Sequence, residues 1–162
     1  PAKFIYDKEG LAELSYFWED LYKIKGKCRP DWLSNDGNTV VDLKTTQDAS
    51  PKGFQKSIAN FGYHIQCAWY LRGLTKLGVP AKEFIFIAIE KTAPYCIGVY
   101  RADEDMINAG MSEVEKSLEL LRICQETKLY PDYTPTIQDI SLPPWMTNKK
   151  VTPQNYQEIE LY

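Results

Sequence analysis

Two aspartates on either side of a predicted turn have the residue type and spacing of a metal site. The turn signal Asp36-Gly37 separates two strand-like segments. A tight hairpin there would pair residues whose numbers sum to 73. Asp31 then faces Asp42, with Cβ atoms about 4.5 to 5.5 Å apart, and like charges so placed repel each other. We therefore expect a cation between the two carboxylates.

The residues next to Asp42 would complete an oxygen-ligand site. Strand alternation places Lys44 on the same face as Asp42, whereas Leu43 turns away and leaves its carbonyl near the site. Two carboxylates, a carbonyl and water suit magnesium. A divalent ion there can bind a phosphate and lower the pKa of a coordinated water, and Lys44 can position that water or stabilise the charged transition state. This pattern indicates phosphodiester hydrolysis.

Solvated hairpin charges explain the same residues about equally well. The acid-x-Lys triplet occurs again at Glu126 to Lys128, where an ion pair at a helix end accounts for it. The first copy differs because Pro30 precedes Asp31 and because both acids lie in aromatic or β-branched segments, where an unpaired charge is costly. On the residues alone, a metal site and solvated charges remain even alternatives.

A predicted helix at residues 54–77 carries further candidates. Gln66 and Tyr70 are four residues apart and share one face, so they could hold a phosphate or the catalytic residues. Helix spacing alone favours a surface glutamine and a tyrosine at the margin of the core. Basic residues around this helix could contact DNA phosphates, although ordinary surface charge is the simpler interpretation of each. They are Lys52, Lys56 and Arg72.

Composition excludes several classes of protein. The chain has one histidine and four scattered cysteines, so zinc is disfavoured and a bound metal would be held by oxygen. The cysteines are typical of small buried residues in a reduced, cytoplasmic protein. A net charge of -3 gives no global attraction to nucleic acid, which would need a local basic groove. The longest apolar run has the length of a strand, so no membrane span is expected.

The order of elements predicts one α/β domain with a helical crossover. A Pro-rich tail at residues 130–162 is expected to wrap the surface without extended regular structure. Pro1 suggests a processed chain or a fragment. The expected strands are residues 14–18, 27–33, 39–45, 83–90 and 95–100, and the expected helices are residues 54–77 and 103–127.

Four longer segments carry a family resemblance that spans roughly residues 13–146. They are GKCRPDWL, VVDLKTTQDASPKGFQKSIANFGYHIQCAWYLRGL, FIFIAIEKTAPYCIGVY and ISLPPWM. Together they resemble the nuclease domain of RecE-type exodeoxyribonuclease VIII, within the PD-(D/E)XK nuclease superfamily. The RPD and DLKTT motifs and Gln66-x-x-x-Tyr70 also look like the group that contains the RecB nuclease domain and lambda-type exonuclease. The resemblance implies an α/β fold with a central mixed β-sheet flanked by helices.

The resemblance also implies roles for the candidate residues. Asp31, Asp42 and the Leu43 carbonyl would be metal ligands, and Lys44 would be the catalytic lysine. The metal would be Mg2+, with Mn2+ as a substitute. Gln66 and Tyr70 would join the catalytic set.

Members of the family place another acid, and often a histidine, before the first aspartate motif. Glu13 is the candidate acid, and no histidine precedes Asp31 in this sequence. Either that residue lies in a missing N-terminal segment or this member does without it, and Pro1 favours the first. We therefore expect residues 1–162 to be a single nuclease domain that lacks N-terminal elements of the family.

In function, the resemblance implies 5′-to-3′ digestion of linear double-stranded DNA from its ends. The product would be a 3′ single strand for a RecT-like annealing protein, made by a ring-shaped homo-oligomer in a phage or prophage recombination pathway. Two alternatives are an endonuclease or single-strand nuclease of the same superfamily, and a non-catalytic DNA-binding or assembly module. The complete set of Asp31, Asp42 and Lys44 argues against the second.

Overall fold

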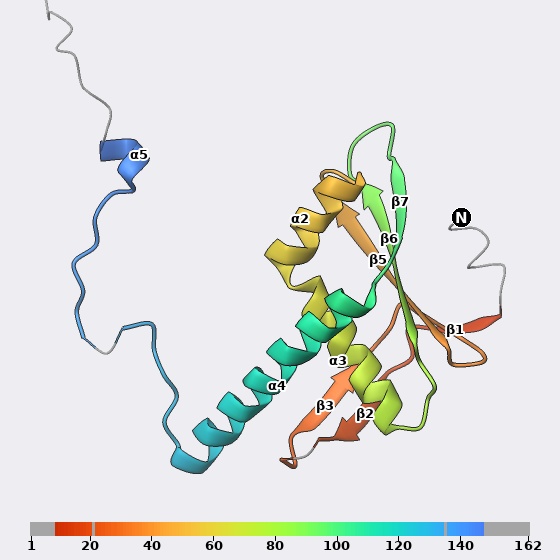
Figure 1. Cartoon of the computed structure of the whole chain (residues 1–162), viewed down its shortest axis with the longest axis horizontal. Helices are drawn as coiled ribbons and strands as arrows, with labels where there is room; N and C mark the ends of the chain where they lie inside the picture. Colours follow the sequence, from red (N-terminus) through yellow and green to blue (C-terminus); the bar gives the residue numbers. More distant parts are fainter. Residues whose placement is uncertain (1–8, 21, 135, 148–162) are drawn as a thin grey trace, which may run out of the picture. The chain divides into compact units, whose positions relative to one another are not determined.

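A mixed sheet of five strands forms the centre of residues 1–129, the larger of two structural units (Figure 1). The computed structural model describes residues 9–20, 22–134 and 136–147. Strands β5 and β6 are parallel, and the other neighbouring pairs are antiparallel. The predicted α/β class is confirmed. In spatial order the strands are β1 (Gly10–Ala12), β4 (Trp32–Ser34), β5 (Thr39–Thr46), β6 (Glu83–Glu90) and β7 (Ile97–Arg101).

The β4–β5 hairpin has the register expected from its turn. Trp32 pairs with Val41 and Leu33 with Val40, so the residue numbers sum to 73 as predicted. The connection, however, spans residues 35–38 rather than two residues, and within it the Gly37 N–H donates to the Ser34 carbonyl at 2.8 Å. The longer loop adds one residue to each side of the turn. The register is therefore unchanged.

The single strand predicted at residues 27–33 is wrong. Lys25–Cys28 is β3, which pairs with β2 (Tyr16–Glu19) in a separate two-stranded sheet, and β4 begins only at Trp32. Pro30 lies between the two strands and cannot donate a ladder hydrogen bond. The break lets one segment serve two sheets and leaves Asp31 just before β4.

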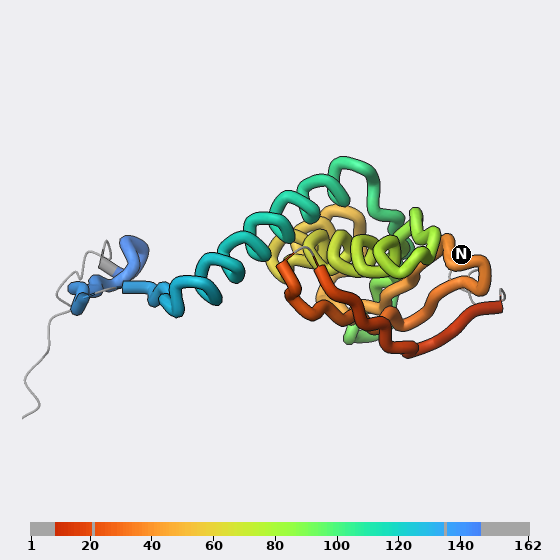
Figure 2. The backbone as a smooth tube through the Cα atoms, turned by 90° about the horizontal axis from the view of Figure 1, so that it is seen from below, coloured from red at the N-terminus to blue at the C-terminus, as the bar shows by residue number. Residues whose placement is uncertain are grey.

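The crossover from β5 to β6 consists of two helices instead of the one predicted. Helix α2 (Pro51–Phe61) ends at Gly62, whose left-handed φ of 67° suits glycine, and α3 (Tyr63–Lys76) begins directly after it. Helix α4 (Glu104–Thr127) follows β7, packs on α3, and is capped by the Asp103 side chain. All three helices lie on one side of the five-stranded sheet (Figures 1 and 2).

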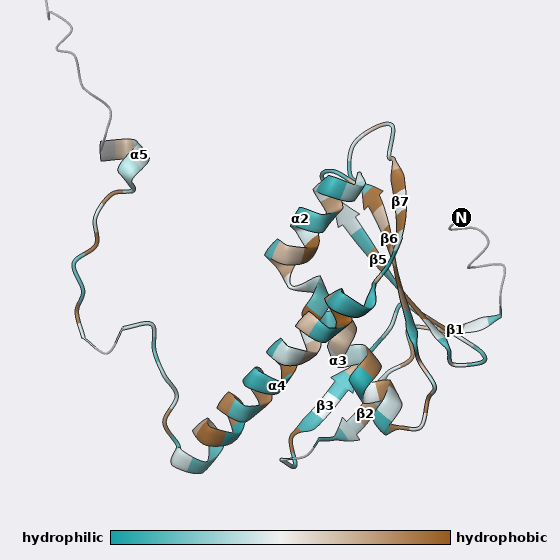
Figure 3. Ribbon diagram, viewed as in Figure 1, coloured by the Kyte–Doolittle hydropathy of each residue, from teal (hydrophilic) through white to brown (hydrophobic). Residues whose placement is uncertain are grey.

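The main core lies between the sheet and the helices. Phe84 and Phe86 of β6 contribute fully buried rings, and β6 is among the most hydrophobic strands in Figure 3. Phe54 of α2 packs on Phe86 with ring centroids 5.8 Å apart. Three cysteines are buried as expected, but the prediction is wrong for Cys96, which is exposed. The buried ones are Cys28, Cys67 and Cys124.

Residues 130–162 form the second unit. In its described part, which is residues 130–134 and 136–147, the only regular element is α5 (Pro144–Thr147). That part agrees with the expectation of little regular structure, whereas wrapping of the surface stays a prediction. Among the helices of the described residues, none combines the length and apolar character required for a membrane span.

Candidate active site

Asp42 is the buried centre of the candidate site. Strand β5 directs Asp42 and Lys44 toward α3, and Asp42 is only 2% exposed. The Lys44 ammonium forms an ion pair with Oδ2 of Asp42, and Gln66 of α3 donates from Nε2 to Oδ1 at 2.9 Å. Three residues predicted from the sequence are thus in direct contact.

Asp31 and β6 lie on opposite sides of β5. Oδ2 of Asp31 accepts a hydrogen bond from the Leu43 N–H at 2.6 Å. The N–H and C=O of one residue in an extended strand point to the same side. The Leu43 carbonyl therefore faces the side occupied by Asp31, while its side chain is 42% exposed. The structure thus brings the Asp31 carboxylate and the Leu43 backbone together, and their role as metal ligands stays a prediction.

The electrostatics of Asp42 show incomplete charge compensation. Burial raises the pKa of Asp42, and the nearby charge of Asp31 raises it further, whereas Lys44 and Gln66 act in the opposite direction. A cation shared by the two carboxylates would offset both unfavourable effects. The oxygen donors present at this position therefore fit a hard divalent ion.

The cluster has two acids rather than three. Within residues 9–20, 22–134 and 136–147, no three His, Cys, Asp or Glu side chains gather closely enough to hold a metal ion. Glu13 donates its backbone N–H to the Asp31 carbonyl at 3.2 Å, but its carboxylate pairs with Arg29 Nε at 2.9 Å on the surface. The structure therefore places the Glu13 backbone beside the site and its carboxylate outside the cluster.

Tyr63 belongs to the site although the sequence analysis missed it. The Lys44 ammonium lies 4.7 Å from the centroid of the Tyr63 ring, a cation–π contact that restrains the lysine between this ring and Asp42. Tyr63 is three residues before Gln66 and seven before Tyr70, so all three share one face of α3. That spacing was the available signal.

Tyr70 marks the other end of this face. Its hydroxyl is 3.5 Å from the Arg29 carbonyl, and burial raises the pKa of Tyr70. The structure thus brings the tyrosine to the segment that precedes Asp31. Tyr70 also lines a cavity of about 450 Å³ together with Ser15, Lys27, Cys28 and Arg29.

The three predicted phosphate contacts lie in different surroundings. Lys52 and Lys56 are exposed on α2, and Lys56 lines a cavity near Tyr63. Arg72 is instead half-buried and makes two hydrogen bonds, of 2.8 and 2.9 Å, to the fully buried carboxylate of Asp20. We therefore reassign Arg72 from a phosphate contact to a structural ion pair.

Arg72→Met is expected to lower the free energy of unfolding by about 3 kcal/mol, because it removes both hydrogen bonds from the guanidinium to the buried Asp20 carboxylate. Urea denaturation measures the change. Lys116→Met is the matched control, since its ion pair with Glu113 is exposed and screened by solvent, so that its loss should hardly change stability. Equal losses in the two variants would contradict the structural role of Arg72.

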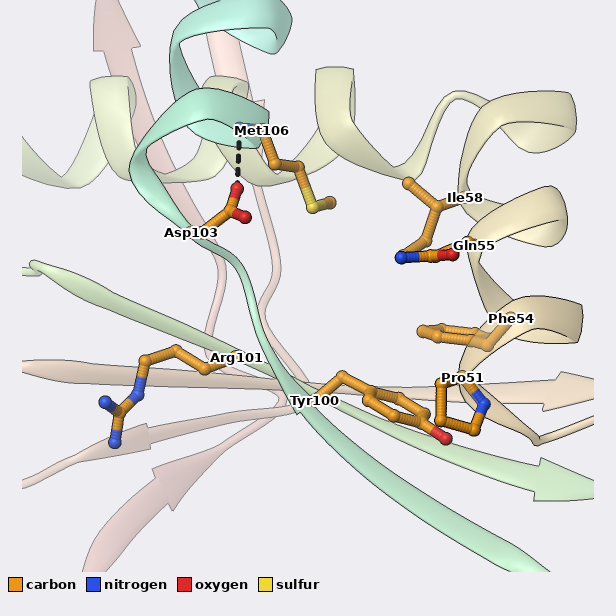
Figure 4. Close-up of a pocket in the computed structure, with 8 residues that line it drawn as sticks. All are labelled: Pro51, Phe54, Gln55, Ile58, Tyr100, Arg101, Asp103 and Met106. Carbon is orange, nitrogen blue, oxygen red and sulfur yellow. Dashed lines mark hydrogen bonds between the residues drawn. The ribbon is translucent and has the colours of Figure 1, made fainter.

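A separate cavity of about 300 Å³ lies between α2, β7 and the start of α4 (Figure 4). Phe54 and Tyr100 stack with ring centroids 5.3 Å apart, and the Tyr100 hydroxyl donates to the Ala49 carbonyl at 2.5 Å. Asp103 caps α4 through the Met106 N–H, and Arg101 points away from the other lining residues. The hydrogen bonds of Tyr100 and Asp103 stabilise local structure, so this cavity is not the candidate site.

A family described as a PDDEXK-like domain of unknown function matches residues 2–142. The chain belongs to this family. The PDDEXK-like fold also matches the crystal structure of a protein from Eubacterium rectale described as a "Putative exonuclease", with a TM-score of 0.67 and 15% identity. The match covers 93% of this chain and 61% of that protein, so the chain spans about three fifths of its length. This likeness concerns the fold.

More distant comparisons add nothing to the PDDEXK-like assignment. The crystal structure of SSO0001 is 19% identical, with a TM-score of 0.44 over 68% of this chain and 50% of that one. That score is too low to support an argument. No curated protein matches the chain.

Proposed function

We propose that this PDDEXK-like protein is a magnesium-dependent deoxyribonuclease, with manganese able to replace magnesium. One observation carries the proposal: the buried carboxylate of Asp42 contacts both Lys44 and Gln66, on the strand whose Leu43 N–H binds Asp31. Membership of the PDDEXK-like family supports a nuclease.

In this proposal, Asp31, Asp42 and the Leu43 carbonyl would hold the ion. When bound, magnesium supplies neutralisation of the phosphate charge and a lower pKa for a coordinated water. Lys44 lies between Asp42 and the Tyr63 ring, and it would present its ammonium to the attacking water or the scissile phosphate.

The remaining α3 residues position these groups. Gln66 fixes the orientation of the Asp42 carboxylate through Oδ1. Tyr70, at the far end of the same helix face, would contact the substrate backbone near Arg29, whose carbonyl its hydroxyl already approaches. Both residues thus act on orientation rather than on bond cleavage.

The finer proposal is an exonuclease of the RecE type. The sequence segments resembling RecE support 5′-to-3′ digestion of linear duplex ends, release of a 3′ single strand to a RecT-like protein, and a ring-shaped oligomer. The Eubacterium rectale structure, described as a "Putative exonuclease", supports the exonuclease class. A net charge of -3 gives little general attraction to duplex DNA, so sustained digestion would depend on enclosing the substrate.

Enclosure predicts dependence on DNA ends. With magnesium, the protein is expected to degrade linear duplex and to spare the same DNA as a covalently closed circle. Gel analysis of both substrates in one reaction measures the preference, and light scattering measures the oligomeric state. Nicking of closed circles at the rate of linear digestion, or full activity as a monomer, would replace the exonuclease with an endonuclease of the same superfamily.

A further inference from the structure

A cavity of about 520 Å³ lies beside the candidate site, at the carboxyl end of β5. Its lining combines the ends of β5 and β6 with one side of α2. Tyr63, which contacts Lys44, forms part of the wall. The cavity and the Asp42 centre therefore share a side chain.

Phe61 is an exposed aromatic ring on the rim of this cavity. It is the last residue of α2 and is 69% exposed. One face of its ring stacks on Tyr63, with centroids 5.7 Å apart and an interplanar angle of 30°. A single exposed phenylalanine is ordinary on a protein surface. This one, however, extends an aromatic stack that begins at the catalytic lysine.

Two lysines make the cavity cationic. Lys56 comes from α2, and Lys91 follows β6, where its N–H donates to the Thr46 carbonyl at 3.1 Å. One carboxylate, Asp48, shares the lining. Hydrogen bonds from Ser50 lower the pKa of Asp48, and the nearby charge of Lys56 lowers it further. Asp48 thus partly neutralises Lys56 and leaves Lys91 as the main free cation of the described lining.

The axis of α3 connects this cavity to the one on the opposite side of the site. Tyr63, Gln66 and Tyr70 lie on one face of α3. Tyr63 lines the cavity that includes Phe61, Gln66 contacts Asp42, and Tyr70 lines the cavity that includes Arg29. The seven steps from Tyr63 to Tyr70 span about 10 Å along a helix. Basic side chains therefore flank the acidic centre on both sides.

We propose that the cavity bounded by Phe61, Tyr63, Lys56 and Lys91 binds a single strand of DNA next to the scissile phosphate. Phe61 stacks on a base, and Lys91 contacts the backbone. Proteins that hold single strands without sequence preference combine such aromatic platforms with a cationic groove. The proposal rests on the proposed nuclease function and specifies the form of its substrate: one strand, separated from its complement at this point.

The test measures binding without cleavage. A labelled oligothymidylate is titrated with the full chain in chelator, and fluorescence anisotropy gives Kd. Phe61→Ala is expected to raise Kd about tenfold, because it removes the ring on which a base would stack. Phe61→Trp is expected to bind as tightly as the wild type. Since Phe61 is exposed, both Phe61 variants should have the melting temperature of the wild type.

Lysines at the two ends of β6 provide a matched pair. Lys91→Ala should lower the slope of log K against log salt by about 0.7, the value for one phosphate contact on a single strand. Lys82, just before the other end of the strand, is also exposed, and Lys82→Ala should leave the slope unchanged. Equal slopes in the two variants would overturn the contact assigned to Lys91.

Three results would overturn the proposed binding of a single strand in this cavity. They are wild-type affinity in Phe61→Ala, a loss of affinity in Phe61→Trp equal to that in Phe61→Ala, and competition by blunt duplex DNA as strong as that by single-stranded DNA. The outcome is separable from the nuclease proposal. Binding that depends on Phe61 in a protein without cleavage would support the groove and contradict the nuclease. Cleavage by the wild type, with DNA binding that does not depend on Phe61, would support the nuclease and contradict the single-strand site.

Discussion

Asp42→Asn and Asp31→Asn are each expected to lower cleavage of linear duplex by about a thousandfold or more. The two carboxylates are the charged ligands proposed for the metal, and a metal ion contributes several kcal/mol of charge stabilisation to the transition state, with about 1.4 kcal/mol for each factor of ten. Both variants should also weaken magnesium binding. Initial rates and calorimetric titration with Mn2+ measure the two effects.

Lys44→Ala should lose cleavage to a similar extent but retain metal binding. A protonated lysine donates hydrogen bonds and cannot be a ligand. Asp105→Asn is the control for the aspartate variants, because Asp105 is an exposed acid in the first turn of α4. Loss of metal affinity in Lys44→Ala equal to that in Asp42→Asn would show that the role of Lys44 is misassigned.

Magnesium is expected to raise the melting temperature of the wild type. Binding to the folded state alone adds about 2.7 kcal/mol at a concentration 100-fold above Kd. For a chain of this size that corresponds to roughly 5 to 10 °C. Differential scanning fluorimetry in magnesium and in chelator measures the shift. No shift at millimolar magnesium or manganese would count against the site.

The Asp42→Asn variant distinguishes metal binding at this site from a general effect of salt on the melting temperature. Burial raises the pKa of Asp42 in the folded protein, so its ionised form costs folding free energy at neutral pH. Removing the charge while keeping an oxygen for Gln66 should leave melting in chelator at or above that of the wild type. In magnesium the order should reverse. A variant that melts lower in chelator and still responds to metal would contradict the account.

The sequence was most informative where local chemistry determines structure. The turn signal at Asp36-Gly37 was enough to place Asp42 opposite Asp31, because the loop lengthens symmetrically and keeps the register. Helix spacing likewise placed Gln66 and Tyr70 on one face, although it left the choice between core and site open. That choice depended on which strand the face would meet.

Long-range partners were beyond reach of such reasoning. The carboxylate that engages Arg72 comes from Asp20, 52 residues earlier in the chain, so nothing local indicated that the arginine was occupied. The assignment of β3 and β4 to different sheets was similarly hidden, since Pro30 signals an irregularity but not which strand each half of the segment will pair with. The helix break at Gly62 did have a local signal, and it is the reason that Phe61 and Tyr63 can stack.

The account is tested most directly by release of label from an end-labelled linear duplex, with wild type and Lys44→Ala purified in parallel. Parallel purification controls for contaminating nuclease. The account predicts release by the wild type in magnesium, no release by the wild type in chelator, and no release by Lys44→Ala in either. Release by the wild type in chelator, equal release by the two proteins in magnesium, or no release by the wild type would contradict a metal-dependent nuclease built on Asp31, Asp42 and Lys44.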